Sequence, residues 1–268
     1  MQDYKNANLP LWNEITPVHA RSAFYDLEGF KRGKSSLRPL EIEEVGDVAG
    51  KSLLHLQCHF GMDTLSWARL GASVTGVDFS DVAIDLAQSL AQELRLDARF
   101  VCANIYDLPE RLSGQFDMVY TSVGAICWLP DLPRWAEIIA HFLTPGGTFY
   151  IRDGHPFLSM FENERDTTTY RVAYPYFQGP EPLRFEPDGD YADPSFTGTH
   201  TSYEWIHSLS TIINSLTRAG LRIEFLNEFD HCDWQFFPFM QQGADGLWRL
   251  PEGYTPIPLM FSLKATRR

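Results

Sequence analysis

The sequence predicts a three-layer α/β fold in which a mostly parallel sheet lies between two layers of helices. Short apolar runs suited to buried strands alternate with amphipathic helical patterns from about residue 50 to residue 152. The segments 221–229 and 258–267 alternate as strands and have no helical pattern between them, which predicts an antiparallel pair at the edge of the sheet. We therefore expect a parallel sheet closed by an antiparallel C-terminal strand.

The expected elements follow one another as right-handed βαβ units require. Strands are expected at 52–57, 73–78, 98–103, 116–123 and 148–152, and helices at 64–70, 81–96, 132–143 and 208–219. Asp63 is expected to cap the first of these helices, and Gly71 to end it. One buried stripe should hold Leu132, Trp135, Ile138, Ile139 and Phe142, and another should hold Val82, Leu86, Ala87, Leu90, Ala91 and Leu94.

We expect one domain with four parts. Residues 1–50 are rich in aromatic side chains and should form an N-terminal cap, and residues 51–152 should form the cofactor-binding core. From 153 to 205 the periodicity stops, and a segment of this length is usually a functional insertion, so we predict a substrate lid there. Residues 206–268 should supply a helix and the closing strands.

Charge and cysteine usage narrow the classes of partner. The formal net charge is −13 and no run of Lys or Arg occurs, which disfavours nucleic acid because phosphate backbones are bound by cationic side chains. We find no signal peptide and no stretch long enough for a membrane span. The four cysteines form no C-x-x-C pair, so we expect a reduced cytoplasmic protein. We also expect a monomer or a homodimer, and no metal site.

The loop after the first strand predicts a particular kind of cofactor. In open α/β sheets, ligands bind where the strands end, and an acidic residue ~20 positions after the first loop commonly holds ribose hydroxyls. Asp78 is that residue. The loop reads Gln57-Cys58-His59-Phe60-Gly61, whereas a dinucleotide-binding loop needs glycines to approach a pyrophosphate. The sequence therefore favours a nucleoside cofactor without phosphates over NAD. The alternative is that Asp78 binds no ligand and lies in the turn before a helix capped by Ser80.

Four segments in this order resemble the motifs of the class I S-adenosylmethionine-dependent methyltransferases. Residues 53–61 match the hydrophobic positions, the cysteine and the last glycine of the first motif, whereas His55 stands in place of an acid, and Gln57 and His59 in place of two glycines. The other segments are 74–80, 100–109 and 116–131 followed by 142–153. The resemblance implies a Rossmann-like fold that binds S-adenosylmethionine, releases S-adenosylhomocysteine and methylates a small molecule.

The same resemblance implies which residues bind the cofactor. Asp78 would accept from the ribose, Phe79 and Ile105 would pack against the nucleoside, and Asn104 would face the adenine amine in place of an acid. Backbone groups near Gln57 and Gly61 would meet the methionine tail. The full set of implied cofactor residues is Gln57, Cys58, His59, Gly61, Asp78, Phe79, Asn104, Ile105 and Ser122.

The acceptor should lie under the lid. A general base is needed only where the acceptor must lose a proton, and His155 is the first candidate because it follows the fifth strand. Glu204 and His207 come next. Further candidates are Asp230, His231 and Asp233, and the aromatic residues expected to line an apolar pocket are Trp128, Tyr203, Trp205, Trp234 and Phe236. Trp12 and Tyr25 are expected over the cofactor, and His19 is expected equally at the surface or in the site.

Three functions remain open from the sequence. The first is a methyltransferase acting on a small molecule. The second is a catalytically inactive sensor or partner subunit that binds the same cofactor, which the altered first loop motivates. The third is an NAD-dependent oxidoreductase, which the loop chemistry disfavours.

Overall fold

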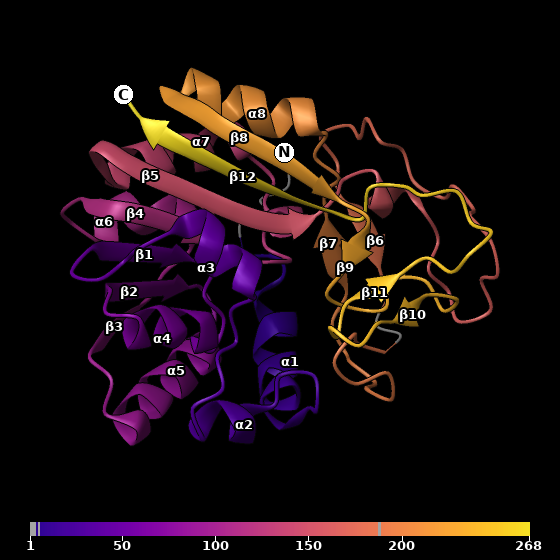
Figure 1. The fold of residues 1–268 in the computed structure, drawn as a ribbon, viewed down its shortest axis with the longest axis horizontal. Coiled ribbons are helices and arrows are strands. Elements are labelled where there is room, and N and C mark those ends of the chain that lie inside the picture. Colours follow the sequence, from indigo (N-terminus) through magenta and orange to yellow (C-terminus); the bar gives the residue numbers. More distant parts are fainter. Residues whose placement is uncertain (1–3, 5, 187–188) are drawn as a thin grey trace.

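The computed structural model describes residue 4 and residues 6–186 and 189–268, and its central feature is a seven-stranded sheet (Figure 1). The strand order is β3-β2-β1-β4-β5-β12-β8. Strands β1 to β5 run parallel, and β12 pairs antiparallel with both β5 and β8. The strands are β1 (Ser52–Leu56), β2 (Ser73–Asp78), β3 (Ala98–Cys102), β4 (Phe116–Thr121), β5 (Leu143–Gly154), β8 (Leu221–Phe229) and β12 (Met260–Arg267). The predicted fold class is confirmed.

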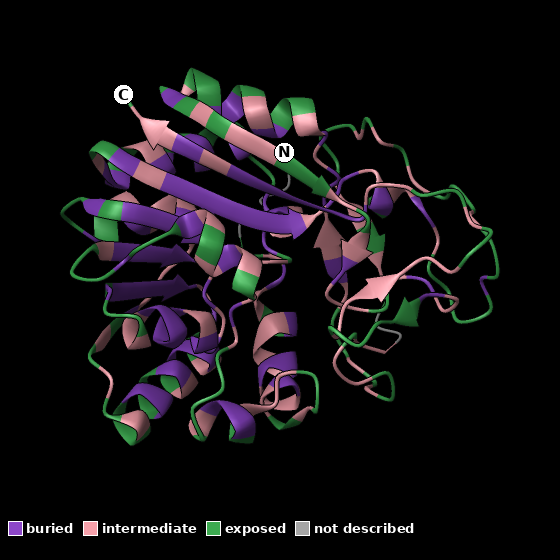
Figure 2. Ribbon diagram, viewed as in Figure 1, coloured by how far each residue is buried: buried purple, intermediate pink, exposed green. Residues whose placement is uncertain are grey.

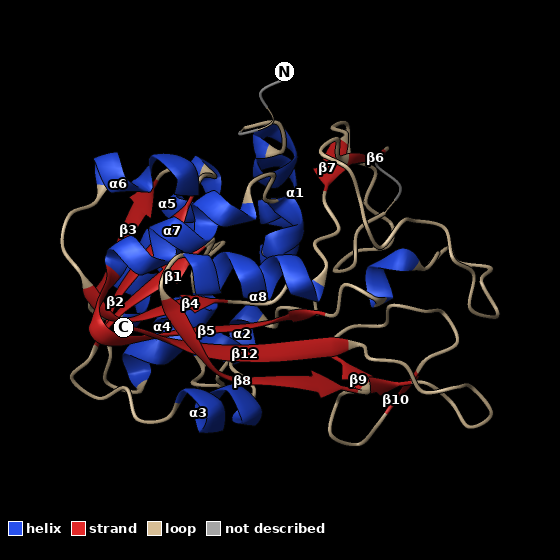
Figure 3. Ribbon diagram, turned by 90° about the horizontal axis from the view of Figure 1, so that it is seen from above, coloured by secondary structure: helices blue, strands red, loops and turns tan. Residues whose placement is uncertain are grey.

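Helices cover both faces of this sheet, as Figure 3 shows for α3 on one side and α7 and α8 on the other. The helices are α1 (Leu9–Arg21), α2 (Leu27–Lys31), α3 (Pro39–Val45), α4 (Met62–Arg69), α5 (Asp81–Leu94), α6 (Leu108–Arg111), α7 (Leu132–Phe142) and α8 (Leu209–Arg218). Successive residues of β1 face opposite layers: Leu54 packs with the core of α7 and α8, and Leu53 packs with Trp67 of α4. Strands buried on both faces explain the continuous apolar runs in the sequence.

The helical stripes match the prediction for α7 and differ for α5 (Figure 2). All five predicted stripe residues of α7 are buried. In α5 the buried residues are Ala83, Ile84, Ala87, Leu90 and Ala91, whereas Val82 and Leu86 are half-buried. The buried face of α5 is rotated from the predicted one because the helix packs against α1 as well as against β2 and β3. Asp63 is not the cap of α4 either, because the cap residue is Gly61.

A second group of short strands lies beyond the carboxyl end of the sheet (Figure 1). These strands are β6 (Leu183–Phe185), β7 (Ser202–Glu204), β9 (His231–Cys232), β10 (Gln241–Gln242) and β11 (Trp248–Arg249). One apolar cluster joins Leu158 and Phe161 of the lid to Cys232, Phe237 and Leu259. The segment 230–259 therefore packs with the lid. Within the described residues, no helix is both long and apolar enough to span a bilayer.

Candidate functional site

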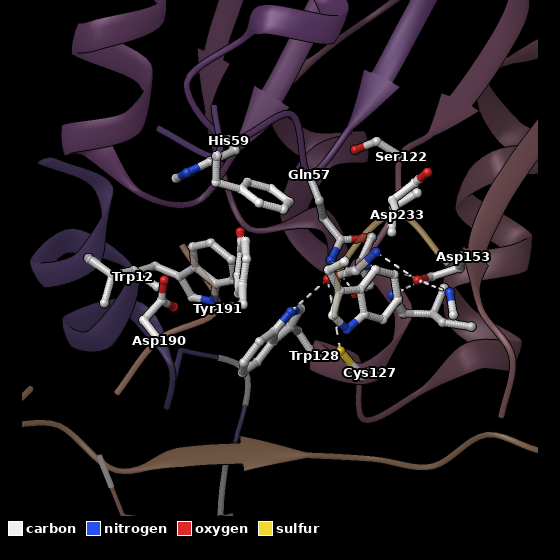
Figure 4. A pocket seen from close by; sticks show the side chains of 18 of the residues that line it. Trp12, Gln57, His59, Ser122, Cys127, Trp128, Asp153, Asp190, Tyr191 and Asp233 are labelled. Carbon is white, nitrogen blue, oxygen red and sulfur yellow. Dashed lines mark hydrogen bonds between the residues drawn. The ribbon is translucent and has the colours of Figure 1, made fainter. Parts of the chain in front are cut away.

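A cavity of about 1640 Å³ lies at the carboxyl ends of the parallel strands, between the sheet, α1 and the lid (Figure 4). Its volume exceeds the ~300–1,000 Å³ of common small-ligand sites, so it has room for two ligands side by side. All nine residues predicted to bind the cofactor line it, together with Glu204 and His207. The structure therefore brings the residues predicted to bind the cofactor to one cavity.

The loop after β1 keeps a glycine-like backbone without the glycines. Gln57 has a φ of 56° and His59 a φ of 50°, which is the left-handed region that L-residues rarely adopt. At these two positions the first methyltransferase motif, which residues 53–61 resemble, has glycine. Each costs of order 1–2 kcal/mol, and such strain persists at functional sites where the surroundings hold it in place. The side chains gained at these positions are therefore candidates for function.

Gly61 ends this loop and permits no side chain. Its φ is 83°, and a Cβ atom built there would lie 2.8 Å from the Phe100 ring and 3.0 Å from Ala87. We expect Gly61→Ala to lower the free energy of unfolding by about 3 kcal/mol, as strain and overpacking add.

Urea unfolding measures this effect, and Gly220→Ala is the control. Gly220 follows α8 and has a φ of 90°, but nothing lies within 4 Å of its added Cβ, so only the backbone strain of about 1 kcal/mol should appear. Equal losses in the two variants would contradict the packing argument.

Asp78 holds the loops after β1 and β2 together. Its Oδ2 accepts from the backbone N–H of His59 at 2.8 Å, and its Oδ1 accepts from the N–H of Ser80 at 2.9 Å. Burial raises the pKa of this carboxyl to about 6, and the backbone hydrogen bonds only partly offset that effect. Ser80 caps α5 by accepting from Ala83, as the alternative interpretation expected. Asp78 lines the cavity nonetheless, and each oxygen keeps a lone pair for a further donor.

The end of the cavity beside β3 is made by Asn104, Phe79 and Ile105. Asn104 Oδ1 accepts from the N–H of Tyr106 at 3.0 Å, and its Nδ2 donates to Asn6. Ile105 is buried and Phe79 is half-buried. This wall is apolar on its faces and carries an amide at its rim, which suits a planar heterocycle.

The centre of the cavity carries an unpaired acceptor. Gln57 Nε2 donates to the carbonyl of Ala125 at 2.8 Å, whereas its Oε1 is buried and has no hydrogen-bond partner among the described residues. Below it, His55 contacts Thr64 Oγ1 at 2.8 Å and Ser122 Oγ at 3.1 Å. Burial lowers the pKa of His55 to about 3, so the ring is neutral where the motif usually carries an acid. Buried acceptors are normally paired, so Gln57 Oε1 points to a ligand donor.

A charged cluster lies near the start of α4, and Asp233 is its only member that the sequence predicted as a site residue. Arg38 Nε lies 3.0 Å from Asp233 Oδ1, and the buried Arg152 also pairs with Asp233. Asp63 faces the same space, and burial raises its pKa. Arg38, Asp63 and Asp233 line the cavity and could meet a zwitterionic group. Asp230 and His231 do not line it.

Asp153 fixes the loop after β4 on the other side of the cavity. Its carboxylate accepts from the backbone N–H groups of Gly124 and Gly154 at 2.6 and 2.7 Å, and from Ala125 and Ile126 at 3.2 Å. Four donors on one buried carboxylate position this loop and Trp128 beside it. Its place at the end of the fifth strand was the available sequence signal.

The three candidate bases have different surroundings. His155 does not line the cavity, because its Nδ1 accepts from the N–H of Phe157 and its Nε2 contacts Glu228 at 2.9 Å on the outer strand β8. His207 donates from Nε2 to the carbonyl of Leu129 at 2.7 Å, and burial lowers its pKa to about 4. This placement disfavours His155 and leaves His207 a weak base.

Glu204 differs from both histidines. Its Oε1 accepts from Ser202 Oγ at 3.1 Å, and its Oε2 has no hydrogen-bond partner among the described residues. Burial raises the pKa of this carboxyl to about 7. A cavity-lining carboxylate that titrates near neutrality is suited to proton transfer.

The aromatic predictions hold for most residues. Trp12, Tyr25, Trp128, Trp205, Trp234 and Phe236 line the cavity, whereas Tyr203 packs against Tyr4 outside it. His19, expected equally at the surface or in the site, is fully buried and does not line the cavity. Figure 4 shows Trp12, His59, Asp190 and Tyr191 together on one side, opposite Asp153 and Asp233.

Comparisons with known proteins agree with this geometry. A family model described as a methyltransferase domain matches residues 53–147. A ubiquinone biosynthesis O-methyltransferase of Escherichia coli O7:K1 is 29% identical over 211 residues, which are 77% of this chain and 82% of that protein.

Solved structures show the same fold. An S-adenosylmethionine-dependent methyltransferase from Mesorhizobium loti has a TM-score of 0.60 at 20% identity, covering 88% of this chain and all of that one. The glycopeptide N-methyltransferase MtfA, solved with S-adenosylmethionine, has a TM-score of 0.52 at 17% identity and covers 84% of this chain and 85% of that one. At these identities the likeness concerns the fold.

Proposed function

The chain is a class I S-adenosylmethionine-dependent methyltransferase, and from that premise we propose that its acceptor is a small molecule bound under the lid. The size of the cavity carries this proposal. It extends from the cofactor loops to the aromatic residues Trp205 and Trp234, so cofactor and acceptor can lie in one cavity. The E. coli relative bears the name of an O-methyltransferase of ubiquinone biosynthesis, which supports a small organic acceptor. We expect the protein to act in the cytoplasm.

The residues of the cavity suit the cofactor. Asp78 is proposed to accept from the ribose hydroxyls, and the wall of Phe79 and Ile105 to pack on the adenine. Gln57 Oε1 offers an acceptor and Arg38 a guanidinium to the amino-acid end. S-adenosylmethionine supplies a methyl group already activated on a sulfonium, so the protein contributes mainly by holding the two reactants in line.

Glu204 is proposed as the general base. It is the one of the three candidate side chains that both lines the cavity and has a pKa near neutrality. A phenol or hydroxyl acceptor must lose its proton to attack, and an ammonium must lose its proton before it can attack.

A melting experiment separates the candidate functions. We expect S-adenosylhomocysteine at 100 times its Kd to stabilise the protein by about 2.7 kcal/mol and raise the melting temperature, whereas NAD has no effect. Incubation with methyl-labelled S-adenosylmethionine and a panel of phenols, catechols and amines then tests transfer.

Two results would contradict the proposal. Stabilisation by NAD alone would favour an oxidoreductase. Tight binding of S-adenosylhomocysteine without transfer to any member of the panel would favour the catalytically inactive sensor.

A further inference from the structure

A chain of hydrogen bonds connects the lid to the cofactor loop through α1. Asp190 of the lid lies 3.0 Å from His19 Nε2, and His19 Nδ1 lies 2.9 Å from His59 Nε2. The three residues are far apart in the sequence, on the lid, on α1 and on the loop after β1. The side chain of His19 is fully buried and that of Asp190 is 11% exposed, so solvent hardly competes for these bonds.

The carboxylate at one end determines the protonation pattern of the other two residues. An ionised Asp190 can only accept, so His19 Nε2 carries a proton and donates it. In a neutral His19 ring, Nδ1 is then an acceptor, so His59 must donate from Nε2. Burial lowers the pKa of His59, so with that tautomer of His19 the His59 ring is neutral and its Nδ1 is a bare acceptor.

That bare acceptor has no partner in the protein. His59 Nδ1 is buried and makes no hydrogen bond within the described residues. His59 lines the cavity, and its own backbone N–H donates to the Asp78 carboxylate. A buried acceptor beside the proposed ribose site is costly unless a ligand donor satisfies it.

Aromatic rings pack around Asp190, His19 and His59 and fix their positions. Tyr25 stacks on His19 with ring centroids 5.1 Å apart, and Trp12 meets His59 edge-on at 5.3 Å. Tyr191, next to Asp190, contacts the Tyr25 hydroxyl. The lid therefore closes on α1 at the same place where α1 supports the cofactor loop, so the contacts form one packed unit.

We propose that Asp190, His19 and His59 form a relay through which the closed lid presents His59 Nδ1 to a hydrogen-bond donor of the cofactor. Asp190 and His19 are positioning residues in this relay. The inference rests on the proposed function, because it takes S-adenosylmethionine or S-adenosylhomocysteine as the ligand. It makes cofactor affinity depend on a residue of the lid.

A double-mutant cycle tests the relay by calorimetric titration with S-adenosylhomocysteine, without turnover. Asp190→Ala should weaken binding about tenfold in the natural background, since the tautomers of both histidines are then no longer fixed. His59→Gly removes the end of the relay and suits the left-handed backbone. In that background, Asp190→Ala should change the Kd less than about twofold.

Two variants serve as controls. Asp190→Asn keeps an acceptor for His19 and should recover most of the affinity. Asp193→Ala alters a nearby lid carboxylate that bonds only within its own turn, to Ser195, and should leave the Kd unchanged.

Equal losses from Asp190→Ala in the two backgrounds, or a loss from Asp193→Ala as large as that from Asp190→Ala, would overturn the relay. Both results would mean that lid loosening alone weakens binding. Those results leave the proposed function standing, because the natural chain still binds S-adenosylhomocysteine. Failure of the natural chain to bind it at all would overturn the function and the relay together.

Linkage gives a second readout. If the lid strengthens cofactor binding through the relay, then the cofactor must stabilise the closed lid by the same factor. Amide hydrogen exchange in residues 189–205 should slow on addition of S-adenosylhomocysteine, and the slowing should be lost in His59→Gly. Equal slowing in both proteins would overturn the relay.

Discussion

Replacing Asp78 with alanine is expected to weaken S-adenosylhomocysteine binding by more than about tenfold, because two ribose hydroxyls lose a charged acceptor. The substitution also removes the acceptor for the N–H groups of His59 and Ser80, so the loop after β1 loses its anchor. Both effects act in the same direction on affinity. Calorimetric titration measures the Kd, and circular dichroism checks that the sheet is intact.

The pH dependence of binding isolates the charge of Asp78. Its pKa lies at about 6, above the ordinary value, and only the ionised form can accept from both hydroxyls. Affinity should therefore be full above pH 7 and fall as the pH drops through 6. In Asp78→Asn this fall should disappear. A natural protein whose Kd stays constant from pH 7.5 to 5, or an Asp78→Ala variant with unchanged affinity, would refute the ribose role.

The sheet could be predicted because its strands carry the signal locally. Strands β1, β2 and β4 each lie within three residues of the predicted bounds, because a strand buried on both faces must be apolar throughout. The edge strand β8 has its predicted bounds because apolar and polar residues alternate along it. The antiparallel closure by β12 followed from the absence of a helical pattern before it. The exposure of α5 was harder to predict, because it depends on α1, a partner that the periodicity of α5 does not reveal.

A site residue could be predicted only where its place depends on its own position in the fold and not on distant residues. The place of Asp78 in the cavity follows from the topology alone, because this residue ends β2. The tolerance of left-handed backbone at Gln57 and His59 could not be predicted, because propensity argues against it and the compensation comes from distant residues such as Ala125 and Asp78. His155 follows the correct strand, but its orientation depends on the neighbour Glu228 across the sheet.

These departures form a pattern. The loop has exchanged small, permissive residues for side chains with hydrogen-bonding groups, and the acid at position 55 for a neutral histidine. The side chains of Gln57 and His59 reach the loop after β4 and α1, respectively. A loop that is strained but held by three elements is more rigid than a glycine-rich one, and rigidity lowers the ordering cost of binding.

Replacing Glu204 with glutamine is expected to have the largest effect on turnover. If Glu204 accepts the acceptor's proton, kcat should fall by about 10²–10⁴-fold, while the Kd for S-adenosylhomocysteine changes less than about twofold. Glutamine keeps the shape and the hydrogen bond from Ser202, so a loss reports on proton transfer rather than on packing. Steady-state kinetics with a phenol or amine that is methylated by the natural enzyme measures kcat, and calorimetric titration measures the Kd.

The pH profile identifies the group that titrates. The base must be ionised, and burial places the pKa of Glu204 at about 7, so kcat/KM should rise through pH 7 and level off above it. Ser202→Ala removes the hydrogen bond that lowers this pKa, so the rise should move to higher pH with the plateau rate retained. Glu41, whose pKa is also about 7, lies on α3 beside Tyr120, and Glu41→Gln should leave the profile in place. A Glu204→Gln enzyme that keeps its rate would instead mean that the acceptor reaches the site already deprotonated.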